Sequence, residues 1–128
     1  MVQEPNGSPF DRTLGPGRPT TGVTHWWLER VTAVALLPLT VWLVASVIAH
    51  VDDDYASVIG WLRTPLAASL MSLLLAATFW HAGLGLQVVV DDYVRSALKV
   101  PLLIAVRLGC FALAGAGILA VLHIVLRM

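Results

Sequence analysis

The sequence predicts an all-α integral membrane protein, a bundle of three transmembrane helices with a flexible polar N-terminal tail. Hydrophobic residues make up 58% of its 128 residues and charged residues only 12%, which is more apolar surface than a soluble domain of this size can hide from water. Three separate apolar stretches are long enough to cross a bilayer, since a helix needs about 20 apolar residues to do so. Lipid offers no hydrogen-bond partners to backbone groups, so each stretch must be helical.

The tail is expected to cover residues 1–24, which are rich in Gly, Pro and polar residues and lack the apolar core of a secretion signal. Residues 25–128 form the transmembrane domain, and its third apolar stretch is interrupted only by Arg107. The formal net charge is zero, so no overall positive field draws nucleic acid to the chain. The spans are expected at residues 30–51, 63–91 and 100–126.

The charged residues between the spans predict their orientation. With three crossings, the tail and the second loop share one side of the membrane, and Arg63 and Arg127 lie on the other side with the acidic run at residues 52–54. Because basic residues concentrate in cytoplasmic segments, we expect the N-terminus in the cytoplasm and the C-terminus outside. The basic residues on the expected cytoplasmic side are Arg12, Arg18, Arg30, Arg95 and Lys99.

His81 is the most informative residue of the second span. It lies about four positions, or about 6 Å, from the middle of that span, and ionisable groups at such depth are costly and mark functional sites. Imidazole is an axial ligand of haem iron, and Gly85 follows one turn later, where a flat cofactor could approach the backbone. The alternative is a neutral histidine that forms a hydrogen bond with a neighbouring helix, and the spacing alone favours neither.

A six-coordinate haem needs a second axial ligand, which the other histidines are poorly placed to supply. His50 and His123 are expected near the outer ends of their helices, and His25 precedes the first span on the cytoplasmic side. If His81 binds haem, another chain therefore supplies the opposite ligand. A rival arrangement has His50 and His123 holding a haem near the outer face, although histidines at helix ends are usually interfacial polar groups.

Polar side chains at the cytoplasmic ends of the first two spans allow two interpretations each. Tyr93 could donate a hydrogen bond to a quinone carbonyl, and Asp92 could hold the quinone ring or relay protons, but tyrosine at a helix end is usually an interfacial anchor. Arg30 could meet haem propionates with its planar guanidinium, or could simply follow the positive-inside rule. Cys110 is the single cysteine, and we interpret it as a small buried hydrophobe.

Two stretches resemble the succinate dehydrogenase hydrophobic membrane anchor subunit, the D chain of bacterial respiratory complex II. Residues 81–94 read HAGLGLQVVVDDYV, which is similar to the family's His-Ala-x-x-Gly and later Asp-Tyr pair, with the tyrosine twelve residues after the histidine. Residues 25–33 read HWWLERVTA and are followed by Pro38 and Leu39, which resembles the first helix of alphaproteobacterial members. The third span is generic.

The resemblance implies a subunit of succinate:ubiquinone oxidoreductase in the bacterial inner membrane, with the C-terminus in the periplasm. Its partners would be a flavoprotein subunit, an iron–sulfur subunit, a second anchor subunit similar to cytochrome b556, and membrane lipid. The two anchors would bind haem b and ubiquinone. By position, His81 would be the axial ligand from this chain, Arg30 would lie near the haem propionates, and Tyr93 would form a hydrogen bond with ubiquinone.

Two other functions stay open at this point. One is a cofactor-free structural membrane anchor that docks a soluble partner. The other is a cytochrome b-like subunit of another respiratory oxidoreductase, although such a subunit usually has two mid-membrane histidines in one chain. The chain has no dinucleotide-binding fingerprint and lacks the four thiolates of an iron–sulfur cluster, so we do not expect it to oxidise succinate alone.

Overall fold

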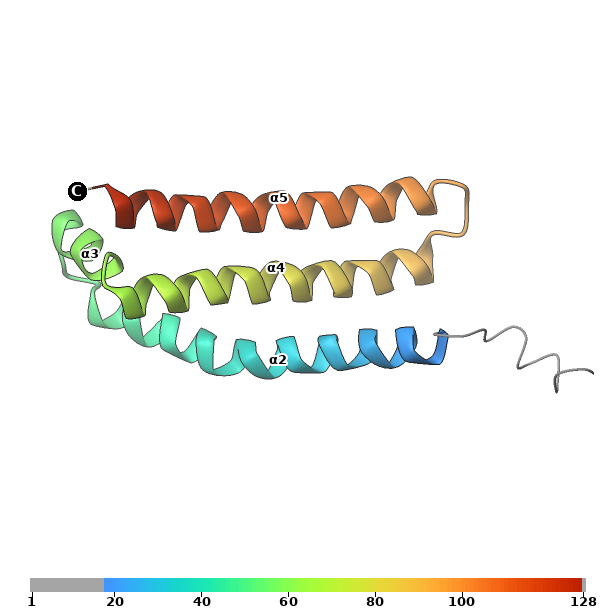
Figure 1. Ribbon diagram of the computed structural model, residues 1–128, viewed down its shortest axis with the longest axis horizontal. Helices are drawn as coiled ribbons and strands as arrows, with labels where there is room; N and C mark the ends of the chain where they lie inside the picture. Colours follow the sequence, from blue (N-terminus) through green and yellow to red (C-terminus); the bar gives the residue numbers. More distant parts are fainter. Residues whose placement is uncertain (1–17, 128) are drawn as a thin grey trace, which may run out of the picture. The chain divides into compact units, whose positions relative to one another are not determined.

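The described residues of the computed structural model, residues 18–127, are almost entirely helical (Figure 1). Side chains are described from Val23 onward, and within this range there are no β-strands. The helices are α2 (Arg18–Ala49), α3 (Tyr55–Leu62), α4 (Pro65–Tyr93) and α5 (Lys99–Leu126). The predicted all-α fold is confirmed.

Three of these helices are long and apolar enough to cross a membrane, as the sequence predicted. Their spanning segments are Val23–Ala49, Pro65–Tyr93 and Lys99–Leu126. The last two agree with the expected bounds to within two residues. Most of the expected tail, residues 1–17, lies outside the described residues, while residues 18–24 belong to α2. Apolar runs mark only the part of a helix within the hydrocarbon core, about 30 Å thick, and a helix can continue into the interfacial layers.

The chain divides into two compact units, residues 1–31 and 32–128. In the second unit α4 and α5 run antiparallel and pack side by side, and α3 contacts both of them (Figure 1). The α2 segment of this unit meets the other helices through side chains. Trp42 of α2 stacks on Trp61 of α3 with ring centroids 5.8 Å apart.

The short helix α3 was not predicted from the sequence. It begins because Asp54 caps it: a carboxylate oxygen of Asp54 accepts a hydrogen bond from the backbone N–H of Ser57 at 3.0 Å, which satisfies one of the orphan donors of the first turn. The following helix α4 begins with the same device, since Thr64 is its N-cap and Pro65 its first residue. The segment between α3 and α4 is also joined to the last turn of α5, because Nε of Arg63 donates a hydrogen bond to the carbonyl of Ile124 at 3.0 Å.

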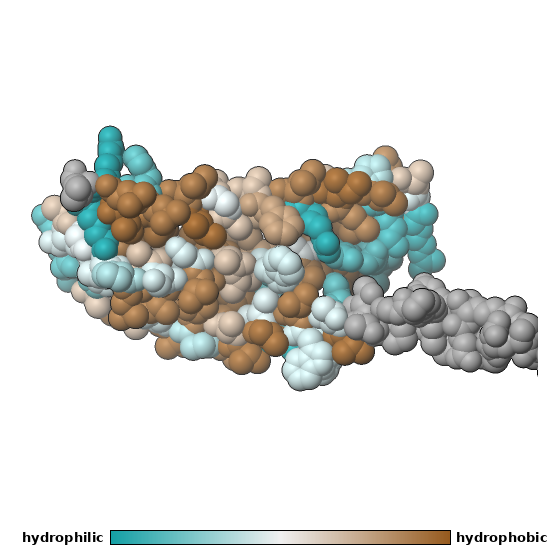
Figure 2. All heavy atoms as spheres, viewed as in Figure 1, coloured by the Kyte–Doolittle hydropathy of each residue, from teal (hydrophilic) through white to brown (hydrophobic). Residues whose placement is uncertain are grey.

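The apolar interior of the described residues is small. Most large apolar side chains face outward, and Figure 2 shows broad hydrophobic areas over the long helices. Such a surface needs lipid or other protein chains to cover it. The buried apolar residues are Ala67, Leu74, Leu84, Val90 and Val121.

Candidate functional site

His81 lies on α4, half-buried, and α2 holds its ring from one side. Nδ1 of His81 is 3.1 Å from Oγ1 of Thr32. A hydroxyl both donates and accepts, so this hydrogen bond can form with either tautomer of the imidazole. When Nδ1 carries the proton it donates to Thr32, and Nε2 keeps the lone pair that a metal ligand needs. The contact is therefore compatible with a histidine that only forms a hydrogen bond to a neighbouring helix. It is equally compatible with a metal-binding histidine whose other ring nitrogen is held by Thr32.

Gly85 lies one turn after His81, and the space beside it is open. A Cβ added at Gly85 would meet no other heavy atom within 4 Å. Residues four positions apart lie on the same face of a helix, so the open surface adjoins the His81 ring. A flat ring, or a helix of another chain, can approach the backbone of α4 there.

Asp92 and Tyr93 are the last two residues of α4, and both are exposed. Tyr93 is 83% exposed, and within residues 23–127 no ion pair is found for Asp92. The neighbouring Asp91 instead pairs with Lys99 of α5, with 3.1 Å between Oδ1 and Nζ. This ion pair fastens the start of α5 to the end of α4. The hydroxyl of Tyr93 and the carboxylate of Asp92 are thus accessible at the end of α4.

Arg30 belongs to the other unit, residues 1–31, and its side chain is exposed. The guanidinium carbon lies 5.3 Å from the ring centroid of Trp26, within the range of a cation–π interaction. Trp26 also meets Trp27 edge to face, with centroids 5.4 Å apart. These contacts keep a charged group among interfacial aromatics. A role of Arg30 toward haem propionates stays a prediction.

The other histidines have different surroundings. Nδ1 of His50 donates to the carbonyl of Ser46 at 2.8 Å, Nε2 is 4.0 Å from a carboxylate oxygen of Asp53, and the ring lies 4.6 Å from that of Trp61. His50 is thus tied to the α2–α3 connection, and His123 is exposed on α5. In the part of the chain that the structure describes, no group of three His, Cys, Asp or Glu side chains could hold a metal ion. A metal bound at His81 needs its remaining ligands from a prosthetic group or another chain.

Two features of this region were missed in the sequence. Thr32 supports His81 across 49 positions, and no local pattern marks such a contact. Arg107 donates from Nη2 to the side-chain carbonyl of Gln87 at 2.9 Å. The signal for the second pair was present, because Arg107 is the one charge that interrupts the third span, but its partner could not be chosen from spacing.

Comparison with known proteins places this architecture in a family. Residues 4–121 match the family described as succinate dehydrogenase/fumarate reductase transmembrane subunit. A succinate dehydrogenase hydrophobic membrane anchor subunit from Rickettsia bellii is 37% identical over 95 residues, covering 72% of this chain and 74% of the relative. The protein of the same description from Rickettsia felis is 29% identical, covering 80% of this chain and 87% of the relative.

A succinate dehydrogenase membrane anchor subunit from Reclinomonas americana is 26% identical, over 61% of this chain and 68% of the relative. The family match extends over nearly the whole described range and includes the span that carries His81. The chain belongs to the family of succinate dehydrogenase hydrophobic membrane anchor subunits.

Proposed function

We propose that this chain anchors a succinate:ubiquinone oxidoreductase in the bacterial inner membrane, binds haem b together with a second anchor subunit, and helps to bind ubiquinone. The observation that carries the proposal is the orientation of His81 by Thr32, 3.1 Å away. Histidines that bind a metal through one ring nitrogen usually direct the other nitrogen to a hydrogen-bond partner, which fixes the tautomer. Thr32 is such a partner for Nδ1.

The residues around His81 fit a haem. The ring is half-buried on a membrane-spanning helix, and Gly85, one turn later, leaves open space beside the backbone that a flat ring would need. Bound there, haem would supply a one-electron carrier. This chain would contribute the Nε2 lone pair of His81, the positioning of that ring through Thr32, and an apolar surface that keeps water away.

Ubiquinone is proposed to bind where α4 ends. The carbonyl oxygens of a quinone need donors, because an unpaired polar acceptor in a dry site is unfavourable. Tyr93 can supply one with its phenolic hydroxyl, and Asp92 can hold or exchange a proton beside it. Both side chains are exposed.

The remaining partners are assigned to the surface by its charge and exposed apolar residues. The flavoprotein and iron–sulfur subunits would dock on the cytoplasmic side, where we place the end of α4 and the start of α5. Arg95 and Lys99 lie in that segment, whereas residues 52–54 at the opposite end are all aspartates, and basic segments favour the cytoplasmic side. Exposed apolar residues along the helices would contact the second anchor subunit and lipid.

The test is a reduced-minus-oxidised visible spectrum of the purified complex, with and without His81→Ala. Removing an axial ligand should abolish the six-coordinate haem b spectrum of the native complex, because axial ligation sets the electronic state of the iron. The matched control is His123→Ala, which removes an exposed histidine of α5 and should leave the spectrum unchanged. An unaltered spectrum in His81→Ala would contradict the ligand assignment.

One alternative has support in the same contact. If the native complex shows no haem absorption, His81 is a structural residue whose hydrogen bond to Thr32 joins α2 to α4. The chain would then be a cofactor-free anchor. In that case His81→Ala should lower the thermal stability of the complex without changing any visible band.

A further inference from the structure

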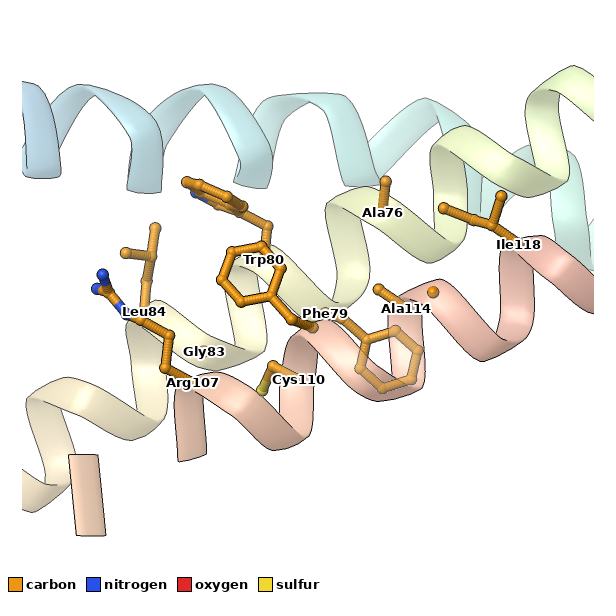
Figure 3. A pocket seen from close by; sticks show the side chains of 11 residues that line it. Ala76, Phe79, Trp80, Gly83, Leu84, Arg107, Cys110, Ala114 and Ile118 are labelled. Carbon is orange, nitrogen blue, oxygen red and sulfur yellow. The ribbon is translucent and has the colours of Figure 1, made fainter. Parts of the chain in front are cut away.

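A groove runs between α4 and α5, where the Arg107–Gln87 pair lies. One section is a cavity of about 350 Å³ lined mainly by apolar and aromatic side chains, among them Trp80, Phe111 and Ile118 (Figure 3). An adjoining cavity of about 280 Å³ is lined by Gln87, Ile104 and other residues. Both cavities share Gly83 and Arg107, so they are two sections of one feature, which we call the α4–α5 groove. His81 does not line it.

Arg107 places a positive charge inside this groove and within a membrane-spanning helix. It is eight residues past Lys99, where α5 begins, or about 12 Å along the axis at about 1.5 Å per residue. Charged side chains at such depth are costly, and they pair with one another or with other polar groups. In Figure 3, Arg107 lies at one end of the row of lining side chains, and Ile118 lies at the other.

Within residues 23–127 no acidic side chain pairs with Arg107. Its described polar partner is the neutral side chain of Gln87, whose Oε1 accepts a hydrogen bond from Nη2 at 2.9 Å. A guanidinium has five N–H donors, so most of its donors remain for another group. That group should be an anion, since planar guanidinium matches phosphate and carboxylate geometry.

The apolar section has the length of a lipid chain in one leaflet. From Arg107 to Ile118, α5 rises by about 16 Å, and half of the hydrocarbon core measures about 15 Å. The smaller cavity lies on the other side of Arg107, toward the start of α5, and Gln87 contributes a polar side chain to its lining. Arginine side chains within the membrane extend toward the interface. The groove thus offers an anion site nearer the membrane surface and an apolar channel nearer the middle.

We propose that the α4–α5 groove binds an anionic phospholipid, with one acyl chain between α4 and α5 along Trp80 and Phe111 and the phosphate bound by Arg107. Basic pockets between transmembrane helices are known binding sites for anionic lipid headgroups. Gln87 orients the guanidinium through the 2.9 Å hydrogen bond. The lipid covers aromatic side chains that are 42% exposed at Trp80 and 55% exposed at Phe111 in this chain.

The experiment measures lipid retention by the intact complex. The purified complex is placed in nanodiscs of phosphatidylcholine with a minor fraction of phosphatidylglycerol, released into mild detergent, washed, and analysed by native mass spectrometry. The native complex should keep phosphatidylglycerol in preference to phosphatidylcholine. Arg107→Gln should reduce that retention about fivefold, as expected from the contribution of one basic residue to binding an anionic lipid. The charge control is Arg127→Gln, an exposed residue just after α5 and outside the groove, which should retain the lipid.

A second pair of variants tests the apolar section. Gly115 lines the groove and a Cβ added there would meet nothing within 4 Å, so Gly115→Leu should fill the groove without disturbing the helix packing and should also lower lipid retention. Ala105→Leu adds a similar volume on an exposed part of α5 outside the groove and should have no effect. Equal retention in Arg107→Gln and the native complex overturns the proposal. The proposal is also overturned if the native complex retains no lipid and the Arg107→Gln complex loses a protein subunit. In that case a protein, not a lipid, fills the groove.

Discussion

The two sides of α4 differ in how much of their surface this chain covers itself. On the side facing α5, a Cβ added at Gly83 would lie 3.6 Å from Sγ of Cys110, and one added at Gly117 of α5 would lie 3.0 Å from a methyl carbon of Leu75. On the side of His81, the ring has one hydrogen bond to Thr32, and Gly85 faces open space. On the first side α4 and α5 touch closely at these two points, whereas the second side is open at Gly85.

Leucine substitutions at Gly85 and Gly117 should give the largest effects of all the variants that test this difference. Gly85→Leu should leave the chain folded but block the approach of a flat ring to α4, so haem absorption per complex should be lost. Gly117→Leu should keep the haem but force Leu75 aside, and overpacking of this kind lowers stability by about 1–3 kcal/mol. The measurements are haem absorbance per mole of complex and thermal unfolding, with subunit composition checked on a gel.

If Gly85→Leu retains full haem absorption in an assembled complex, the cofactor does not lie beside the open side of α4. If Gly117→Leu loses haem while Gly85→Leu does not, the two sides have been assigned the wrong way round. Either result would contradict the difference drawn between the two sides of α4.

Thr32→Val should produce the next largest effect. The substitution preserves shape but removes the hydroxyl that contacts Nδ1 of His81 at 3.1 Å. Loss of an outer-shell partner of a metal ligand typically lowers metal affinity or activity about 10–100-fold. We expect faster transfer of haem from the complex to a haem-scavenging protein, together with a shifted midpoint potential. Thr32→Ser keeps the hydroxyl and should restore both values, whereas equal behaviour of the Val and Ser variants would assign Thr32 a packing role only.

Tyr93→Phe tests the end of α4 rather than its sides. A neutral hydrogen bond contributes about 0.5–1.5 kcal/mol, so quinone reductase activity should fall about two- to tenfold. Succinate oxidation through an artificial acceptor that bypasses the membrane site should not change, and neither should the haem spectrum. A parallel loss of both activities would make Tyr93 structural, and no loss of either would place the quinone elsewhere.

The sequence was sufficient for the membrane architecture because hydrocarbon imposes one strong rule. Apolar length and the absence of charge identify spans without reference to tertiary contacts, and α4 and α5 were located to within two residues. Helix α3 was not predicted because its eight residues are too few to be recognised by counting apolar residues. The cap at Asp54 was visible in the sequence as an acidic residue three positions before Ser57, and reading it as a helix start would have found α3.

In the candidate site, too, some residues could be selected from the sequence and others could not. His81 and Gly85 could be selected because burial of an ionisable group in a span is rare, and because one helical turn places them together. Thr32 could not be selected, since its contact with His81 depends on how α2 packs on α4. Gln87 had the same difficulty as the partner of Arg107. Contacts between helices are set by three-dimensional packing, which a single sequence does not encode in any local pattern.

The smallest expected effect lies at Asp54, the N-cap residue of α3. The hydroxyl of Ser57, and then its backbone N–H, lower the pKa of the Asp54 carboxyl below its ordinary value. A lowered pKa in the folded state means that the cap stabilises α3 fully above the unfolded value, about 3.9, and that this contribution is lost as pH falls through the folded value. Protection of the Ser57 amide from hydrogen exchange, corrected for its intrinsic rate, should therefore decline only in that acid range.

Asp54→Asn separates the cap from its charge. Asparagine is as good an N-cap as aspartate but does not titrate, so the Ser57 amide should stay protected through the acid range. Asp54→Ala removes the acceptor and should lower protection at every pH. If Asp54→Asn loses protection in acid as the native chain does, the sensitive group is another carboxylate of the α2–α3 connection. Asp53, which lies beside the cap and 4.0 Å from Nε2 of His50, is then the residue to substitute next.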